Sequence, residues 1–179
     1  MQMLQTARIM WGALSATPIV FAIVLVVARP RDLVPEVPEM PFIFGGVALL
    51  VAAVSWILPR HQLDLAIRNL ALEQRTEVSK EETLFRDAAP TYQVFVEPFS
   101  SAFRKIAMAY QTAFILGMAM SEAVVLFGLV IGFLGFDPIW AAPFFAVGWI
   151  SMLVRFPRTA PVKRRIEALH GATFSDAPG

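Results

Sequence analysis

Four long apolar stretches constrain this chain more than any other feature of its sequence. They cover residues 9–28, 41–58, 107–136 and 138–154, and a helix needs roughly 17 to 25 mainly apolar residues to cross a bilayer. Only 16% of the residues are charged, whereas a soluble domain carries about 25%. The sequence therefore predicts an all-α membrane protein with four transmembrane helices.

Polar sequence separates these spans into two pairs. Residues 60–106 form a long insert between the second and third spans, and residues 155–179 form a tail. In the insert, Leu63, Ile67 and Leu70 recur at helical spacing, which predicts a short amphipathic helix. The expected architecture is a single membrane domain of two hairpins, with a helical cytoplasmic insert between them.

The Lys and Arg residues predict how this domain is oriented. The insert carries seven of them and the tail carries five, whereas the short turn between the third and fourth spans has none. Positive residues favour the cytoplasmic side of a membrane. Both termini and the insert are therefore expected in the cytoplasm, and the protein is expected in the inner membrane of a bacterium.

Several functional classes lack the residues that they need. The chain has no cysteine, and its two histidines, His61 and His170, lie in different polar segments. We find no nucleophile elbow, no phosphate-binding loop and no zinc-protease motif, and no basic stripe for nucleic acid. We therefore expect no catalytic residues, no metal, no cofactor and no nucleic-acid partner. The lipid bilayer is the expected surrounding.

Glu122 is the most informative single residue, because it lies near the middle of the third span. An acidic residue there costs about 2.5–3.5 kcal/mol on insertion scales, so it is expected to face other helices or a wet cavity. One interpretation is a clasp that hydrogen-bonds a neighbouring helix, for which Ser15 and Thr17 of the first span are candidates. The other is a site that binds and releases a proton or a cation. Gln111 lies on the same face, three turns away.

Small residues form a stripe beside Glu122 that lets another helix approach closely. The stripe consists of Gly117, Ser121, Gly128 and Gly132, and the second span has a similar one in Gly45, Ala48, Ala52 and Ser55. Packing within the bundle is the simpler interpretation. An interface between subunits is the alternative.

The two halves of the chain show a weak internal similarity. The first and third spans align without gaps when Gly12 is set against Gly117, and Thr17 then falls opposite Glu122. The sequence thus suggests an internal duplication with parallel repeats.

Residues 111–134, QTAFILGMAMSEAVVLFGLVIGFL, also carry a family resemblance. The stretch is rich in small residues and carries one acidic residue in the pattern Ala-x-x-Glu, with Gly-Leu-Val further on. It resembles the carboxylate-bearing helix of the proteolipid (c) subunit of rotary ATP synthases. The resemblance implies that Glu122 is an ion-binding carboxylate. The direction agrees, because the second span would run inward and the third outward, as in a proteolipid hairpin.

The sequence thus predicts a small proteolipid-like membrane subunit that works within a homo-oligomer or a larger membrane complex. The alternative is a non-transporting accessory or scaffold subunit, in which Glu122 is the clasp and the insert docks a partner protein. Phe95, Phe99 and Phe103 lie along one side of the insert and suggest a surface for that docking.

Overall fold

The computed structural model describes residues 2–30, 33, 37–78 and 91–174. These residues are mostly helical, and the chain divides into two compact units. Unit 1 consists of residues 1–61 and 111–157, and unit 2 of residues 62–110 and 158–179. Each unit is described by itself below.

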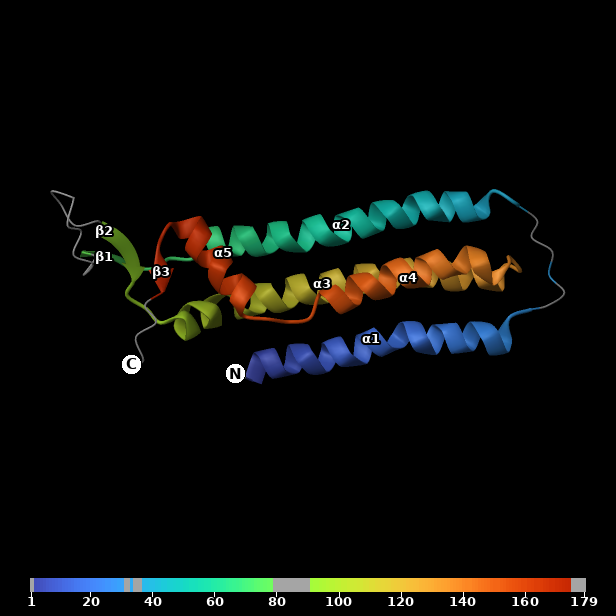
Figure 1. Ribbon diagram of the computed structural model, residues 1–179, viewed down its shortest axis with the longest axis horizontal. Coiled ribbons are helices and arrows are strands. Elements are labelled where there is room, and N and C mark those ends of the chain that lie inside the picture. Colours follow the sequence, from blue (N-terminus) through green and yellow to red (C-terminus); the bar gives the residue numbers. More distant parts are fainter. Residues whose placement is uncertain (1, 31–32, 34–36, 79–90, 175–179) are drawn as a thin grey trace, which may run out of the picture. The chain divides into compact units, whose positions relative to one another are not determined.

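Four apolar helices build unit 1 (Figure 1): α1 (Gln2–Ala28), α2 (Met40–Arg68), α3 (Phe99–Phe133) and α4 (Pro138–Val154). The helices α2 and α3 also contribute residues to unit 2. Among the described residues, α1, α2 and α3 are long and apolar enough to cross a membrane. The helix α4 has 17 residues, which give a length of about 26 Å, so it is shorter than those three.

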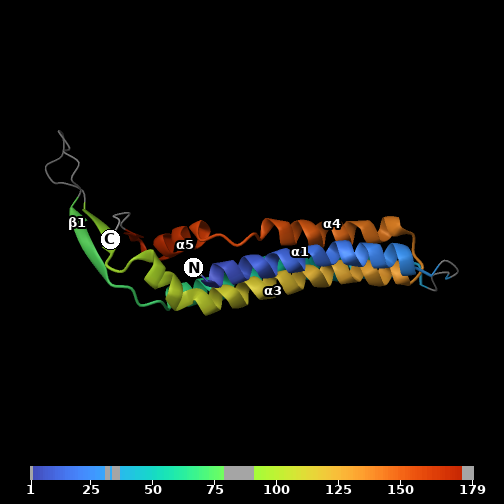
Figure 2. The ribbon, with the colours of Figure 1, turned by 90° about the horizontal axis from the view of Figure 1, so that it is seen from below.

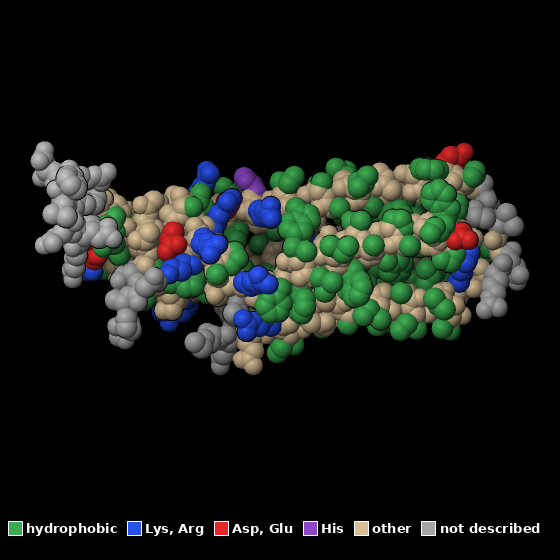
Figure 3. All heavy atoms as spheres, viewed as in Figure 1, with side chains coloured by type: hydrophobic (Ala, Val, Ile, Leu, Met, Phe, Trp, Pro, Cys, Tyr) green, Lys and Arg blue, Asp and Glu red, His purple; other side chains and the backbone are tan. Residues whose placement is uncertain are grey.

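The surface of unit 1 is the kind that lipid covers. Hydrophobic side chains lie along the outside of its helices (Figure 3), and soluble monomers rarely expose apolar patches of more than a few hundred Å². On α1 the exposed large residues include Ile9, Ile23, Val26 and Val27, and on α2 they include Phe42, Ile43, Leu49 and Ile57. The helices and this surface together identify a membrane protein.

Glycines let α4 lie close against α3, and Figure 2 shows α1 running alongside both helices. A Cβ on Gly128 would lie 2.9 Å from the Cβ of Phe144 and 3.0 Å from the carbonyl oxygen of Ala141. A Cβ on Gly132 would collide with the side chain of Leu25 of α1. Gly128 and Gly132 thus pack within the bundle, as the simpler interpretation of their stripe expects.

The helix α4 begins where the fourth apolar stretch begins, and α2 extends beyond the second apolar stretch. The carboxylate of Asp137 accepts a hydrogen bond from the Ile139 backbone N–H (2.9 Å), and Pro138 occupies the first turn. The helix α2, however, continues through Pro59 to Arg68. A proline inside a helix leaves the carbonyl four residues earlier without its helical partner, and that carbonyl is satisfied by other means, described below.

Unit 2 corrects the all-α prediction and the helical insert, because it contains a three-stranded sheet. The strand β1 (Gln74–Val78) pairs antiparallel with β2 (Thr91–Phe95), and β2 pairs parallel with β3 (Thr173–Phe174). The predicted tail supplies β3 and the helix α5 (Ala160–His170). The amphipathic helix expected early in the insert is the end of α2, which runs to Arg68. Its residue Ile67 is fully buried in the core of unit 2.

The predicted docking surface is instead part of that core. Phe95 is buried, and the partly buried Phe99 and Phe103 pack against the same cluster. The rings of Phe95 and Phe174 lie 4.4 Å apart, and Phe99 meets Phe174 edge-on at 5.4 Å. Ile166 of α5 completes the group. The three phenylalanines therefore hold the sheet against the helices of unit 2.

Ion pairs also lie on the surface of unit 2. Arg165 of α5 donates two hydrogen bonds to the carboxylate of Asp64 of α2, and this hydrogen bonding raises the pKa of Arg165. The ammonium of Lys105 donates to Glu97 at 2.8 Å, which lowers the pKa of Glu97 below its ordinary value. Exposed pairs of this kind contribute little to stability, so the apolar core is the main support of this unit.

A close contact between α4 and α3 gives a direct test of the packing of unit 1. A Cβ on Gly148 would lie 2.8 Å from the carbonyl oxygen of Ser121 and would collide with Val125. We expect Gly148→Ala to lower the free energy of unfolding by about 1–3 kcal/mol, because overpacking forces backbone to move. The measurement is thermal unfolding in detergent by circular dichroism.

Gly12→Ala is the matched control, because no atom lies within 4 Å of a Cβ at Gly12 of α1. It is expected to leave stability unchanged or raised, since alanine is the better helix former. Equal destabilisation by the two substitutions would contradict this packing of α4 on α3.

Candidate functional site

Arg155 lies directly after α4, and its guanidinium binds residues of α2 and α3. Nη1 donates to the carbonyl oxygen of Gly117 and to the hydroxyl of Ser121. Nη2 donates to the carbonyl oxygen (2.7 Å) and the hydroxyl (2.9 Å) of Ser55. The guanidinium carbon also lies 4.5 Å from the ring centroid of Trp56. One side chain thus joins the end of α4 to two other helices.

Serine suits both contact positions because a hydroxyl can donate and accept at once. Ser121 donates to the carbonyl of Gly117 (2.9 Å), and Ser55 donates to the carbonyl of Ala52 (2.6 Å). Each hydroxyl oxygen therefore keeps its lone pairs for Arg155. Both serines are only 1% exposed, so water does not compete for these bonds.

Glycine is required beside the same guanidinium. A Cβ on Gly117 would lie 3.3 Å from Nε and 3.4 Å from Cζ of Arg155, which leaves little room for a side chain. The predicted small-residue stripe therefore has two functions in the structure. Gly117 and Ser121 receive Arg155, whereas Gly128 and Gly132 receive neighbouring helices.

Arg155 also explains how α2 continues through a proline. Pro59 has no N–H to donate to the carbonyl of Ser55, four residues earlier. That carbonyl instead accepts the bond from Nη2 of Arg155. In α1, Pro18 leaves the carbonyl of Leu14 free in the same way, and the hydroxyl of Thr17 donates to it at 2.8 Å. A hydroxyl of α1 thus satisfies the carbonyl that Pro18 leaves free.

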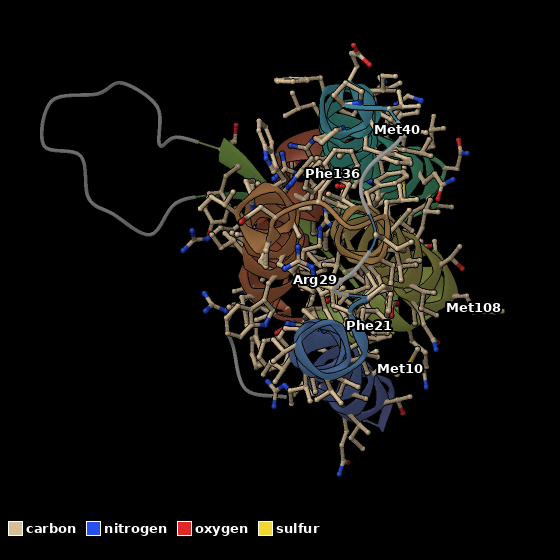
Figure 4. All side chains as sticks on the ribbon, turned by 90° about the vertical axis from the view of Figure 1, so that its right-hand side faces the viewer. Met10, Phe21, Arg29, Met40, Met108 and Phe136 are labelled. Carbon is tan, nitrogen blue, oxygen red and sulfur yellow. The ribbon has the colours of Figure 1, made fainter. Side chains whose placement is uncertain are left out.

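The first helix is tied to the same end of α4. The indole of Trp11 donates to the carbonyl oxygen of Met152 at 2.9 Å, and the last carbonyls of a helix have no partner within it. At the opposite end of α1, Arg29 reaches the carbonyl of Gly135 at 3.4 Å. Figure 4 looks along the helices from this second end and labels Arg29 and Phe136 there. Side chains thus connect the helices of unit 1 at both ends.

Glu122 follows Ser121 on α3, but its side chain points to a different side of the helix. It is half-buried, on the border between the fully buried Met118 and Val125 and the exposed Leu126. Among the residues that the structure describes, none forms a hydrogen bond or an ion pair with its carboxylate. Glu122 is therefore a half-buried acid whose charge has no partner in the described part of the chain.

The remaining predicted site residues are not gathered around Glu122. The hydroxyl of Thr17 is bound to Leu14 within α1. The hydroxyl of Ser15 is buried and has no hydrogen-bond partner in the described part of the chain, while the Ser15 carbonyl accepts from Trp149 at 3.1 Å. Gln111 is half-buried. The clasp from Glu122 to Ser15 or Thr17 is thus not formed in this structure.

Comparison with known proteins identifies no relative of this chain. No family model, curated protein or solved structure matches this chain. Within the described ranges, no group of three or more His, Asp or Glu side chains could hold a metal ion. The arginine bound by two serines, and Glu122, which has no partner among the described residues and follows Ser121 in α3, are therefore the features on which a functional argument rests.

In the sequence, Arg155 is only the first of the five Lys and Arg residues of the tail. The sequence signal for a polar partner at this site is the pair of serines, Ser55 and Ser121, each in a small-residue stripe of an otherwise apolar helix. A guanidinium carries five donors in a fixed plane, so an arginine at a helix end can satisfy several such acceptors. Which serines the arginine contacts depends on how the helices pack, and this packing cannot be predicted from the spacing of residues along the chain.

Replacing Arg155 tests this site. We expect Arg155→Lys to lower the free energy of unfolding by about 2 kcal/mol, since hydrogen bonds to charged groups contribute about 1.5–3 kcal/mol each. A single ammonium cannot reach Ser55 and Ser121 with the planar geometry of a guanidinium. The measurement is thermal unfolding in detergent.

Arg8→Lys is the matched control, because Arg8 is exposed and only lies over the ring of Phe156 (5.7 Å). It is expected to unfold like the original protein. If Arg155→Lys unfolds no earlier than Arg8→Lys, the guanidinium does not support the packing of α2, α3 and α4.

Proposed function

We propose that this chain is a small multi-pass subunit of a bacterial inner membrane, with Glu122 as a protonatable, ion-binding carboxylate within the membrane. The observation that carries this proposal is the position of Glu122, half-buried in the apolar helix α3 with no partner among the described residues. In this proposal α4 is a fourth span, and the four spans form two hairpins. Both termini and unit 2 lie in the cytoplasm.

The free energy of the carboxylate supports this assignment. A charged acid at the centre of a membrane helix costs about 2.5–3.5 kcal/mol on insertion scales, and no contact within the described chain offsets that cost. Binding a proton or a cation removes the net charge. A group that serves only to fix the helices would be expected to hold a partner in the folded chain, as Ser55 and Ser121 do.

Arg155 does not serve as the counter-ion of Glu122. Its four Nη protons are directed to Gly117, Ser121 and Ser55, and Ser121 and Glu122 point about 100° apart around α3. The neutral acceptors bind the cation and leave the acid without an opposite charge. This separation suits a carboxylate that must exchange its proton or ion.

The place of Glu122 on the helix surface supports action in an assembly. The exposed Ala119 and Leu126 lie one turn before and one turn after it on α3, so a second subunit or a partner could reach the carboxylate from the membrane side. The likeness of residues 111–134 to a proteolipid helix supports the same role. We therefore infer a homo-oligomer or a larger membrane complex as the working unit.

Labelling with a hydrophobic carbodiimide tests the role of Glu122. The reagent enters the bilayer and reacts with protonated carboxyls, so Glu122 is expected to be labelled most at low pH and progressively less as it loses its proton. Peptide mass mapping in native lipid measures the extent of labelling. Na⁺ or another bound cation would protect the site.

Glu122→Gln is the matched control and should abolish labelling of residues 111–134. Absence of labelling at every pH, in a protein whose native mass is that of a monomer, would contradict the proposal. That outcome would favour a non-transporting accessory or scaffold subunit, for which the compact unit 2 offers a surface to a partner.

The orientation has its own test, because the chain has no cysteine of its own. In intact spheroplasts, a membrane-impermeant maleimide is expected to label Leu134→Cys, after α3, and to leave Arg68→Cys, at the end of α2, unlabelled. Both residues are exposed in the structure. Permeabilised cells should label both variants. The reverse labelling in intact spheroplasts would show the opposite orientation.

A further inference from the structure

Three arginines lie at one end of unit 1 without an acidic counterpart there. Arg8 belongs to α1, Arg60 to α2, and Arg155 follows α4. The described acidic residues of unit 1 are elsewhere: Glu39 and Asp137 lie at the opposite helix ends, and Glu122 lies within α3. Asp64 lies one turn after Arg60 on α2, but its carboxylate binds Arg165, so positive charge predominates at this end of the unit.

Two of these arginines share one aromatic ring. The guanidinium carbons of Arg155 and Arg60 lie 4.5 Å and 5.0 Å from the ring centroid of Trp56. Arg155 has directed its Nη protons to neutral acceptors. Arg60 is exposed and forms no hydrogen bond or ion pair with any described residue. Two cations this close repel each other, and an anion between or beside them would relieve the repulsion.

The surroundings of this group resemble the border between lipid head groups and acyl chains. Ile57 lies three residues before Arg60 on the same side of α2 and is 67% exposed, and Val154 precedes Arg155 and is 64% exposed. A ligand bound to these arginines would therefore extend over an apolar wall. A free phosphate ion would gain nothing from that wall, whereas the acyl chains of a phospholipid would lie along it.

We propose that Arg60, Trp56 and Arg155 bind the phosphodiester of an anionic phospholipid. A guanidinium matches a phosphate with paired charge-assisted hydrogen bonds, and tryptophan prefers the membrane interface. Arg60 supplies donors that no described residue uses, and Arg155 adds charge from a position fixed by the two serines. The inference rests on the proposed cytoplasmic position of this end of unit 1, and it is independent of what Glu122 binds.

Native mass spectrometry of the detergent-solubilised protein tests this site. We expect phosphatidylglycerol to remain bound in preference to phosphatidylcholine, and inorganic phosphate to leave that binding unchanged. Arg60→Gln is expected to weaken phosphatidylglycerol binding about fivefold, in line with the contribution of one basic residue near an anionic membrane. Arg60→Lys keeps the charge but loses the paired hydrogen bonds of a guanidinium, so its affinity is expected to lie between those of the original protein and Arg60→Gln. Arg60 is exposed, so thermal unfolding should be unchanged.

Arg68→Gln is the matched control, because Arg68 is also exposed on α2 and lies outside the group. Equal binding of the two lipids, or an equal loss in Arg68→Gln and Arg60→Gln, would overturn the proposal. Displacement of the lipid by inorganic phosphate would overturn it too, because the ligand would then be a free anion. In the same measurement, Glu122→Gln should bind phosphatidylglycerol as the original protein does. A failure of the lipid site can therefore be distinguished from a failure of the proposed function.

Discussion

The packing of unit 1 depends on the guanidinium of Arg155. This one group satisfies the hydroxyls of Ser55 and Ser121 and the carbonyls of Ser55 and Gly117. Because it follows directly after α4, it links that helix to α2 and α3. Apolar helices in lipid gain little from burying apolar surface against each other, so polar links of this kind and close glycine contacts determine how they associate.

The same hydrogen bonds from Arg155 compensate for a proline inside α2. A proline inside a helix removes a hydrogen bond and leaves a carbonyl without a partner. In α2 the carbonyl freed by Pro59 accepts from Arg155, and in α1 the carbonyl freed by Pro18 accepts from Thr17. Both helices therefore continue through their prolines. Satisfaction of every backbone group is the strongest constraint on a membrane helix, and here it is met partly by side chains.

The contrast between Arg155 and Glu122 carries the functional argument. The cation is surrounded by acceptors, whereas the acid one residue from Ser121 has none among the described residues. A charged group without a partner in an apolar helix is a functional-site hypothesis by default, and the proposed function rests on it. The exposed Arg60 beside Trp56 is a second group without an ion pair among the described residues, and the proposed lipid site is built on it.

The sequence by itself determined the apolar helices, the start of α4 at Pro138, and Glu122 as the exceptional acid. Hydrophobic length, capping chemistry and the cost of a buried charge are local properties, so they can be predicted from the sequence. The tertiary structure decided that Arg155 meets Ser55, and that the insert and the tail form one sheet with Phe95 in its core. Those contacts join residues far apart along the chain, and spacing alone does not determine them.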